Sequence, residues 1–200
     1  MKKFKDNKLV LASHNKGKLV EIKEMLAPFN IEVLSAGDFN LDEPEETGTT
    51  FAENALLKAN YVASKTGYTA LADDSGLCVN ALDGQPGIYS ARWAGENKDF
   101  IYAMNKVNNK LEELKTNDRS AYFACVLALV CPENKEEYTF EGRVEGDLIW
   151  PISGNNGFGF DPMFMPKGYD KTFGELDHSI KQTISHRSNA FKKFKAFLEK

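Results

Sequence analysis

Residues 8–36, KLVLASHNKGKLVEIKEMLAPFNIEVLSA, carry the pattern that decides the fold class. An apolar run opens the segment at 8–13 and predicts a buried strand. Over about 18–28 the apolar residues recur at spacings of three and four, which predicts a helix. That helix should end near Pro28, because proline fits poorly in a helix interior. Residues 31–36 predict a second strand, and strand, helix and strand in this order indicate an α/β fold.

The rest of the chain predicts further elements of both kinds. Thr50 and Glu53 fit a capping box at the start of a helix, and Gly67 can form its left-handed C-terminal cap. The turn PENKE separates two long predicted strands and predicts an antiparallel hairpin. No repeat or linker interrupts the pattern, so we predict a single domain over residues 1–200. The remaining expected elements are strands at 68–74, 119–131 and 136–149 and helices at about 97–115 and 186–198.

Composition narrows the class of protein. The net charge of −4 lacks the basic excess of a nucleic-acid coat. The three cysteines form no CxxC pair, and they are expected as small apolar fillers in a reducing compartment. The N-terminus has too short an apolar run for a secretory leader, and the longest apolar run, 121–131, is below the ~20 residues of a membrane span. We therefore expect a soluble, cytoplasmic protein without a nucleic-acid or membrane partner.

Basic side chains stand where an anion could bind. SHNKGK at 13–18 lies between a strand and a helix, where free backbone N–H groups attract anions and Lys16 and Lys18 add charge. An ordinary turn with solvated lysines explains this spacing equally well, and a Walker A loop is absent. Lys58 lies on the apolar stripe of its helix. It either extends to solvent or points into a cleft and meets a phosphate.

Acidic side chains form a second candidate group. Asp73 and Asp74 are expected at the end of the strand 68–74, and ligands of α/β sheets bind at strand ends. Burying an ionised carboxylate is costly without a positive partner. Together with Glu45 and Glu46, these carboxylates suit Mg²⁺, which takes a few oxygen ligands plus waters and phosphates. A solvated acidic loop is the simpler interpretation of Glu45, whereas the apolar strand aims Asp74 at a definite place.

Two later stretches complete the set. In GFGFDP, 157–162, glycines permit close approach of a ligand and the phenylalanines offer faces for a base, although a small satellite core is the commoner role for such rings. In KQTISHR, Arg187 interrupts the apolar face of a C-terminal helix that includes Ile184. A lone histidine would be structural by default, but His186 together with Arg187 and Lys181 predicts a polar ligand clamp. Basic groups, carboxylates and aromatic rings together predict a nucleoside triphosphate site.

Seven stretches in order resemble the inosine triphosphate pyrophosphatase family: LASHNKGK, ETGTTFAENALLKA, ADDSGL, LDGQPGIYSARWAGE, GFGFDPMF, KTFGEL and ISHRSNAF. The resemblance covers nearly the whole chain. It implies a mixed α/β fold, with an elongated central sheet flanked by helices and two lobes around a cleft, and a homodimer. It also implies Mg²⁺-dependent hydrolysis of ITP, dITP or XTP between the α- and β-phosphates, giving a monophosphate and pyrophosphate and clearing aberrant nucleotides from the pool.

The resemblance also implies roles for matched residues. Asp74 would be the general base for water, and Glu46 with Asp74 would hold Mg²⁺. The turn has Ser-His where members often have Thr-Gly or Thr-Asn, which leaves the role of His14 open. Substrate contacts would come from Ser13, His14, Asn15, Lys16, Gly17, Lys18 and Lys58 at the triphosphate, from Ser75, and from Phe158, Gly159, Phe160, Asp161, Lys181, His186 and Arg187 at the base and sugar. The alternatives are a nucleotide-binding sensor with little turnover and a pyrophosphatase for other modified nucleotides.

Overall fold

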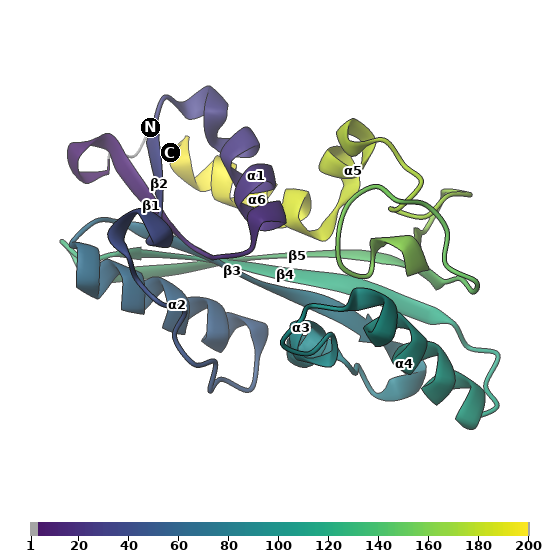
Figure 1. The fold of residues 1–200 in the computed structure, drawn as a ribbon. Helices are drawn as coiled ribbons and strands as arrows, with labels where there is room; N and C mark the ends of the chain where they lie inside the picture. The colour runs from purple at the N-terminus through teal and green to yellow at the C-terminus, as the bar shows by residue number, and fades with distance from the viewer. Residues whose placement is uncertain (1–3, 200) are drawn as a thin grey trace. The chain divides into compact units, whose positions relative to one another are not determined.

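The computed structural model describes residues 4–199 and contains a mixed α/β fold built on a six-stranded sheet of order β2-β1-β3-β4-β5-β6 (Figure 1). Strand β1 is parallel to β2 and β3, and β6 is antiparallel to β5. The expected fold class, a mixed sheet flanked by helices, is confirmed. The strands are β1 Lys8–Ala12, β2 Glu32–Ser35, β3 Ala70–Val79, β4 Ser120–Cys131, β5 Glu136–Leu148 and β6 Phe164–Pro166. The α-helices are α1 Lys16–Leu26, α2 Phe51–Thr66, α3 Ser90–Trp93, α4 Phe100–Glu113, α5 His178–Ile184 and α6 His186–Leu198.

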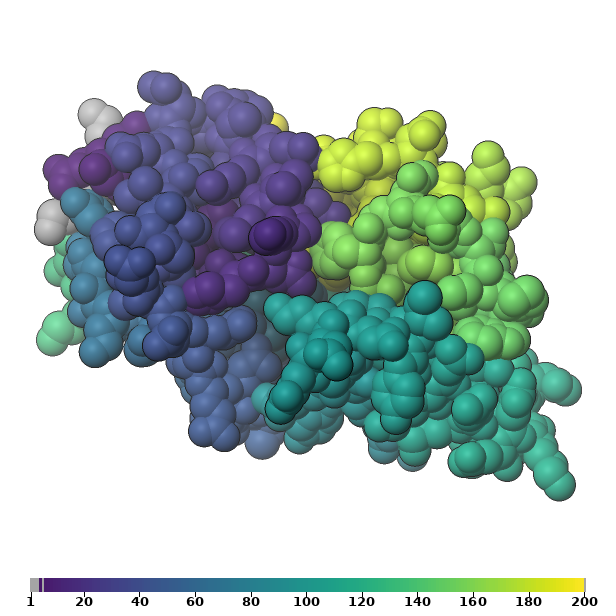
Figure 2. All heavy atoms as spheres, in the orientation of Figure 1, coloured from purple at the N-terminus to yellow at the C-terminus, as the bar shows by residue number. Residues whose placement is uncertain are grey.

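The chain divides into two compact units, each made of several segments. Strands β3, β4 and β5 each begin in one unit and end in the other. Figure 2 shows the early, purple-to-blue part of the chain gathered into one body. Unit 1 comprises Met1–Asp74, Cys125–Glu141 and Ala190–Lys200, and unit 2 comprises Ser75–Ala124 and Gly142–Asn189. The expected single domain and the expected cleft between lobes stay predictions.

In unit 1 the sheet is covered on both faces, because successive side chains of a strand point to opposite sides. Leu9, Leu11 and Leu71 are buried in one apolar cluster with residues of α1 and α6. Val10 and Ala70 are buried in another cluster, with the alanine-rich face of α2. Figure 1 shows α1 and α6 over one face and α2 over the other. Neighbouring residues of β3 therefore meet different helices.

Strand β3 is longer than its sequence suggests. We expected Asp73 and Asp74 to end a strand at 68–74, and this is wrong, since β3 continues through both residues to Val79. The sequence pattern treats Gly76 as a turn signal. In the structure this glycine allows a close approach: a Cβ at Gly76 would lie 2.3 Å from the Gly87 carbonyl oxygen. Glycine here allows the strand to pass close to a neighbouring backbone instead of ending it.

Helix ends agree with the sequence in most places. Gly67 caps α2 with φ +69°, and the Thr50 hydroxyl accepts a hydrogen bond from the Glu53 N–H at 3.1 Å. The Glu53 carboxylate reaches back over the start of the helix, where it accepts from the N–H of Thr49 at 2.6 Å. Helix α6 covers residues 186–198 as expected. Ile184 belongs to the separate helix α5, which the sequence analysis missed.

Unit 2 has an apolar core of its own. The rings of Phe123, Phe164 and Phe173 contact one another there, with ring centroids 4.7 to 6.2 Å apart. Leu77 and Val79 from the second half of β3 are buried in the same cluster. All three cysteines of the chain are free thiols. No helix within residues 4–199 is long and apolar enough to cross a membrane.

Candidate active site

The turn between β1 and α1 is organised by its own polar side chains. The Ser13 hydroxyl accepts a hydrogen bond from the Asn15 N–H at 3.2 Å, and the Asn15 side chain caps α1 by accepting from the Lys18 N–H at 3.2 Å. Lys16 and Gly17 form the first turn of the helix, whose N–H groups have no acceptor within the helix. The exposed His14 ring is bonded to the Leu41 carbonyl oxygen at 2.8 Å. The turn thus brings together N–H groups and lysines, a combination that favours anions.

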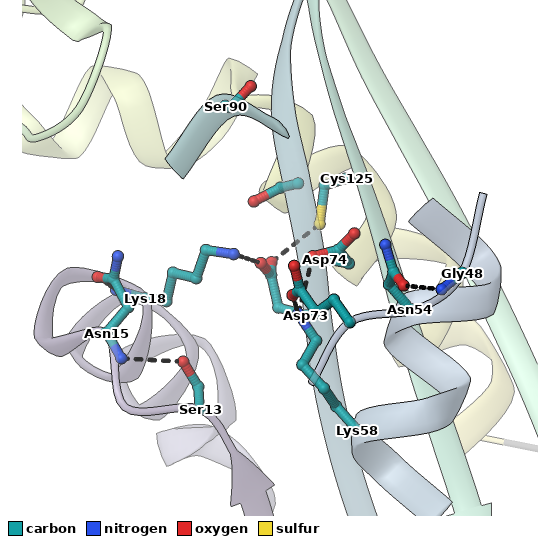
Figure 3. Close-up of polar contacts among 12 residues, drawn as sticks. Ser13, Asn15, Lys18, Gly48, Asn54, Lys58, Asp73, Asp74, Ser90 and Cys125 are labelled. Carbon is teal, nitrogen blue, oxygen red and sulfur yellow. Dashed lines mark hydrogen bonds and ion pairs between the residues drawn. The ribbon is translucent and has the colours of Figure 1, made fainter. Parts of the chain in front are cut away.

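Asp73 points to the face of the sheet that α1 covers. Its fully buried carboxylate lies 2.5 Å from the Lys18 ammonium. The Cys125 thiol, on the neighbouring strand β4, donates to the second oxygen of Asp73 at 3.1 Å (Figure 3). Cys125 is buried in the apolar cluster as expected, and its thiol takes part in a polar contact in addition. Asp73 is therefore held from two sides and has the environment of a structural acid.

Asp74 points to the opposite face, which α2 covers. The Lys58 ammonium donates to Asp74 Oδ1 and to Glu46 Oε1, each at 2.7 Å. Lys58 is 3% exposed, so it does not extend to solvent. One buried ammonium therefore joins two carboxylates, one from a strand and one from the loop before α2. Removing one partner of such a buried pair costs about 3–5 kcal/mol, because the other charge stays buried.

The two carboxylates that share Lys58 differ in their pKa values. Burial raises the pKa of Asp74 to about 6, although Lys58 and Lys18 oppose the shift. Burial also acts to raise the pKa of Glu46, but attraction to Lys58 outweighs it and the pKa falls below its ordinary value. The two carboxylates hold Lys58 in its charged form, so its pKa is raised despite burial. Carboxylates whose pKa values are moved apart in this way can divide acid–base work between them.

Unit 2 contains a second buried ion pair, between Asp161 and Lys181. The Lys181 ammonium donates to Asp161 Oδ2 at 2.6 Å, and the Phe158 N–H donates to the same oxygen at 2.7 Å. The loop folds closely over this carboxylate, since Gly157 has φ +72° and a Cβ there would lie 2.0 Å from Asp161 Oδ2. Gly159 also has a positive φ, +67°. The glycines therefore let the backbone wrap around Asp161.

A half-buried aromatic ring lies beside the cations of unit 2. The Lys181 ammonium is 4.5 Å and the Arg187 guanidinium carbon 5.8 Å from the centroid of the Phe158 ring. Arg187 is 1% exposed and donates to the Ser75 hydroxyl at 3.0 Å. Four predicted substrate residues therefore gather here: Ser75, Phe158, Lys181 and Arg187.

Two other predicted contacts of unit 2 are more deeply placed. The His186 ring is stacked on Phe123, with centroids 4.8 Å apart and an interplanar angle of 16°. Phe160 is 3% exposed and meets Phe100 edge to face at 5.5 Å. Of the two phenylalanines proposed for base stacking, Phe158 has the more accessible ring. The stacking role of both stays a prediction.

Comparison with known proteins identifies the family. A model of the Ham1 family matches residues 9–197. This chain belongs to the Ham1 family. The family expected from the sequence is thereby confirmed.

Several relatives of this Ham1 chain have names that state an activity. A protein of Zymomonas mobilis named dITP/XTP pyrophosphatase is 52% identical, over 98% of this chain and 93% of its own length. A protein of Caulobacter vibrioides with the same name is also 52% identical, over 96% of this chain and 97% of its own length. These names agree with the expected enzyme class, a nucleoside triphosphate pyrophosphohydrolase.

Solved structures of the family have the same fold. The HAM1 protein from Coxiella burnetii superposes with a TM-score of 0.89 at 41% identity, covering 96% of this chain and 98% of that one. The Staphylococcus aureus Ham1 protein gives a TM-score of 0.86 at 43% identity, with the same coverage. The mixed α/β architecture described above is therefore a Ham1 fold.

The carboxylates of this Ham1 chain fit a divalent cation. Glu46 is half-buried and meets Lys58, whereas the neighbouring Glu45 is exposed. Within residues 4–199, the buried Oδ2 of Asp74 has no hydrogen-bond partner, and no three His, Cys, Asp or Glu residues cluster as metal ligands. A cation held by Glu46 and Asp74 would complete its shell with phosphate oxygens and water, as Mg²⁺ usually does.

Asn54 is a candidate functional residue of this Ham1 chain that was not predicted from its sequence. This residue of α2 is fully buried, and its amide oxygen accepts from the Gly48 N–H at 2.8 Å. A signal was present, because Asn54 lies four residues before Lys58 and thus on the same helical face. Two polar residues on the same buried face of a helix indicate a functional role more strongly than one does.

Proposed function

We propose that this Ham1 protein hydrolyses non-canonical purine nucleoside triphosphates, dITP, XTP and ITP, to the monophosphate and pyrophosphate in a Mg²⁺-dependent reaction. The observation that carries the proposal is the shared Lys58, which joins Asp74 and Glu46 in a buried cluster. One of these carboxylates has its pKa raised to about 6 and a buried oxygen available for a further contact. The relatives named dITP/XTP pyrophosphatase supply the substrate class.

In the proposed reaction Asp74 accepts a proton from the attacking water. A base with a pKa near 6 is ionised at neutral pH and still binds a proton well enough to assist the attack. Lys58 fixes Asp74 Oδ1, which leaves Oδ2 to face the water. Mg²⁺, when bound, supplies charge neutralisation on the phosphates. Glu46, with its lowered pKa, stays ionised at neutral pH and would hold the cation together with Asp74.

We assign the phosphates to the turn that precedes α1. Lys16 and the first-turn N–H groups bring positive charge, and phosphates bind readily at such helix N-termini. Lys18 is fixed by Asp73, so its ammonium is held in one place before substrate arrives. Ser13, His14 and Asn15 shape this turn through their hydrogen bonds.

We assign the purine base and the sugar to the polar cluster of unit 2. Lys181 and Arg187 are donors, and they suit the 6-oxo group of hypoxanthine or xanthine. Adenine carries a 6-amino group instead and would leave such donors unpaired, which is the kind of mismatch that rejects a substrate strongly. The Phe158 ring offers a face for stacking.

The test is a substrate panel with detection of pyrophosphate. With Mg²⁺, the purified protein should release pyrophosphate from dITP, XTP and ITP much faster than from dATP, ATP and GTP. Chelation with EDTA should abolish the release, and added Mg²⁺ should restore it. Tight binding of ITP without release of pyrophosphate would favour the sensor, and a preference for modified pyrimidine nucleotides would favour the other enzyme.

We further propose that the protein acts as a homodimer in the cytoplasm, where it clears aberrant nucleotides from the pool. The family resemblance supports this proposal. Analytical ultracentrifugation should show a species of about twice the 22.4 kDa chain mass. A single species of chain mass at micromolar concentration would contradict the dimer.

A further inference from the structure

Asn54 connects the loop that carries Glu46 to the helix that carries Lys58. Its side chain is fully buried, and its amide oxygen accepts from the Gly48 N–H at 2.8 Å. Glu46 lies two residues before Gly48, in a segment without regular secondary structure. Lys58, which meets the Glu46 carboxylate at 2.7 Å, follows Asn54 by one helical turn. The backbone near Glu46 and its carboxylate are therefore both attached to the same face of α2.

The attachment requires glycine at position 48. A Cβ there would lie 2.6 Å from the Asn54 amide oxygen and 2.7 Å from the Glu53 Cβ. Both distances are shorter than real Cβ contacts, so the loop could not lie as it does with any side chain at this position. The position of the loop is thus restricted both by the close approach of Gly48 to α2 and by the hydrogen bond from its N–H to Asn54.

The Asn54 amide nitrogen supplies a second observation. Nδ2 is buried, and no atom within residues 4–199 accepts a hydrogen bond from it. Because the amide oxygen is turned to Gly48, the nitrogen is turned away from the loop (Figure 3). A buried donor without an acceptor is costly, and it indicates an oxygen ligand that is not part of the protein. Oδ2 of Asp74 is a buried acceptor that likewise has no hydrogen-bond partner within residues 4–199. It belongs to the carboxylate whose Oδ1 accepts a hydrogen bond from Lys58.

We propose that Asn54 is a positioning residue of the active site with two roles. Its amide oxygen holds Gly48 and thereby places Glu46 for the cation. Its amide nitrogen donates to an oxygen that arrives with the nucleotide. The inference rests on the proposed function, because it assumes that Glu46 binds a cation and that a phosphorylated substrate enters this site.

Two variants separate the two roles. Asn54→Ala removes both the acceptor and the donor, whereas Asn54→Asp keeps an oxygen for the Gly48 N–H and removes the donor. Asn60→Ala is the matched control, since Asn60 lies on the same helix but is exposed and donates to Glu137 at 2.8 Å. Circular dichroism and thermal unfolding establish that each variant is folded.

The first readout is binding of Mn²⁺ alone, measured without nucleotide from the electron paramagnetic resonance signal of the free ion. Asn54→Ala should weaken binding roughly 10-fold or more, the usual effect of losing a residue that orients a metal ligand. Asn54→Asp should bind Mn²⁺ at least as tightly as the wild type, because the acceptor remains and a negative charge is added. Equal weakening in both variants would overturn the role of the amide oxygen.

The second readout is kcat/KM for dITP at saturating Mg²⁺. Both variants should lose about 10-fold or more, because both lack the donor, and Asn60→Ala should stay within about 2-fold of the wild type. Full kcat/KM in Asn54→Asp would overturn the role of the amide nitrogen. A wild type that binds Mn²⁺ but releases no pyrophosphate from any purine triphosphate would instead contradict the proposed function.

Gly48→Ala tests the same contact from the loop side and leaves Asn54 in place. If Asn54→Ala does not fold, this variant decides the role of the amide oxygen. A methyl group at position 48 should displace the loop and weaken Mn²⁺ binding about 10-fold. Mn²⁺ binding equal to that of the wild type would show that the position of Glu46 does not depend on this contact.

Discussion

Both units bury lysines against carboxylates, but their charge balance differs. In unit 1, Lys18 and Lys58 face Asp73, Asp74 and Glu46, so carboxylates exceed ammonium groups by one. In unit 2, the contacts of Asp161 include Lys181, while Arg187 meets a hydroxyl group and both cations lie near an aromatic ring. The first arrangement has capacity left for a cation. The second has donor groups and a ring, which suit a polar aromatic ligand.

We propose from this difference that catalysis and recognition reside in separate clusters. In unit 1, changes to the Lys58 cluster should lower kcat or metal affinity and changes to the turn before α1 should raise KM, whereas changes in unit 2 should alter KM and the choice of base. Four substitutions test this division, in order of expected effect.

Asp74→Asn should have the largest effect. Loss of the general base should lower kcat for dITP roughly 10²- to 10⁴-fold. Asp73→Asn is the matched variant on the opposite face of the sheet, where the carboxylate orients Lys18. It should lower kcat much less. Steady-state kinetics of the two purified variants checks the distinction, and equal losses of kcat would show that the two acids are not divided as proposed.

Lys58→Met should lower kcat/KM about 100-fold and shift its pH dependence. In the wild type, activity should rise as the pH increases through about 6, where Asp74 loses its proton. Because Lys58 lowers the pKa of Asp74 against the effect of burial, its removal should move the acidic limb to higher pH. A pH profile of kcat/KM from 4.5 to about 9 checks the direction.

Lys65→Met serves as the control for Lys58→Met, since Lys65 is an exposed lysine in the last turn of the same helix. Its pH profile should overlay that of the wild type. An acidic limb that stays in place in Lys58→Met would remove Asp74 as the titrating base.

Lys181→Met should act on the choice of substrate. The ratio of kcat/KM for dITP to that for dATP should fall about 10-fold, because a charged donor to the base is lost. Competition assays with the two nucleotides measure the ratio, and the exposed Lys171→Met provides the control. If the dITP-to-dATP ratio of kcat/KM stays unchanged while kcat falls strongly, Lys181 acts in the chemical step. That result would contradict the separation of catalysis from base recognition.

Lys16→Ala should have the smallest effect. Lys16 is exposed in the first turn of α1, and water and salt screen such a charge. We expect KM for dITP to rise roughly 2- to 3-fold at low salt and the difference to shrink at 0.5 M salt. A change confined to kcat would argue against a role in binding phosphate.

The sequence predicted the elements around both clusters more reliably than their contacts. The strand at β1, the helix at α6 and the Gly67 cap follow from local pattern and backbone preference, and the structure contains them. The continuation of β3 could not be predicted, because the reason for Gly76 is the carbonyl of Gly87, a contact made by folding.

The partners of the buried charged residues could not be predicted from the sequence either. Lys58 was recognised as unusual from its place on an apolar stripe, but its two carboxylates lie 12 and 16 residues away in the chain. The pair of Lys181 and Asp161 spans 20 residues, and Asn54 was absent from the sequence analysis. Such contacts depend on which helix covers which face of the sheet, and local patterns carry no information about that.

The alternation of side chains along β3 has one more consequence. The two adjacent acids have different surroundings because successive side chains of a strand point to opposite faces of the sheet. Which acid points to which face is set by the register of β3 on β1, in which Ala72 lies beside Ala12. Deleting or inserting a single residue just before Asp73 would exchange the faces of the two acids without altering any side chain. The proposed division of roles between the two acids therefore depends on the parity of their positions, so this strand should tolerate substitutions of its apolar residues far better than the insertion or deletion of a single residue.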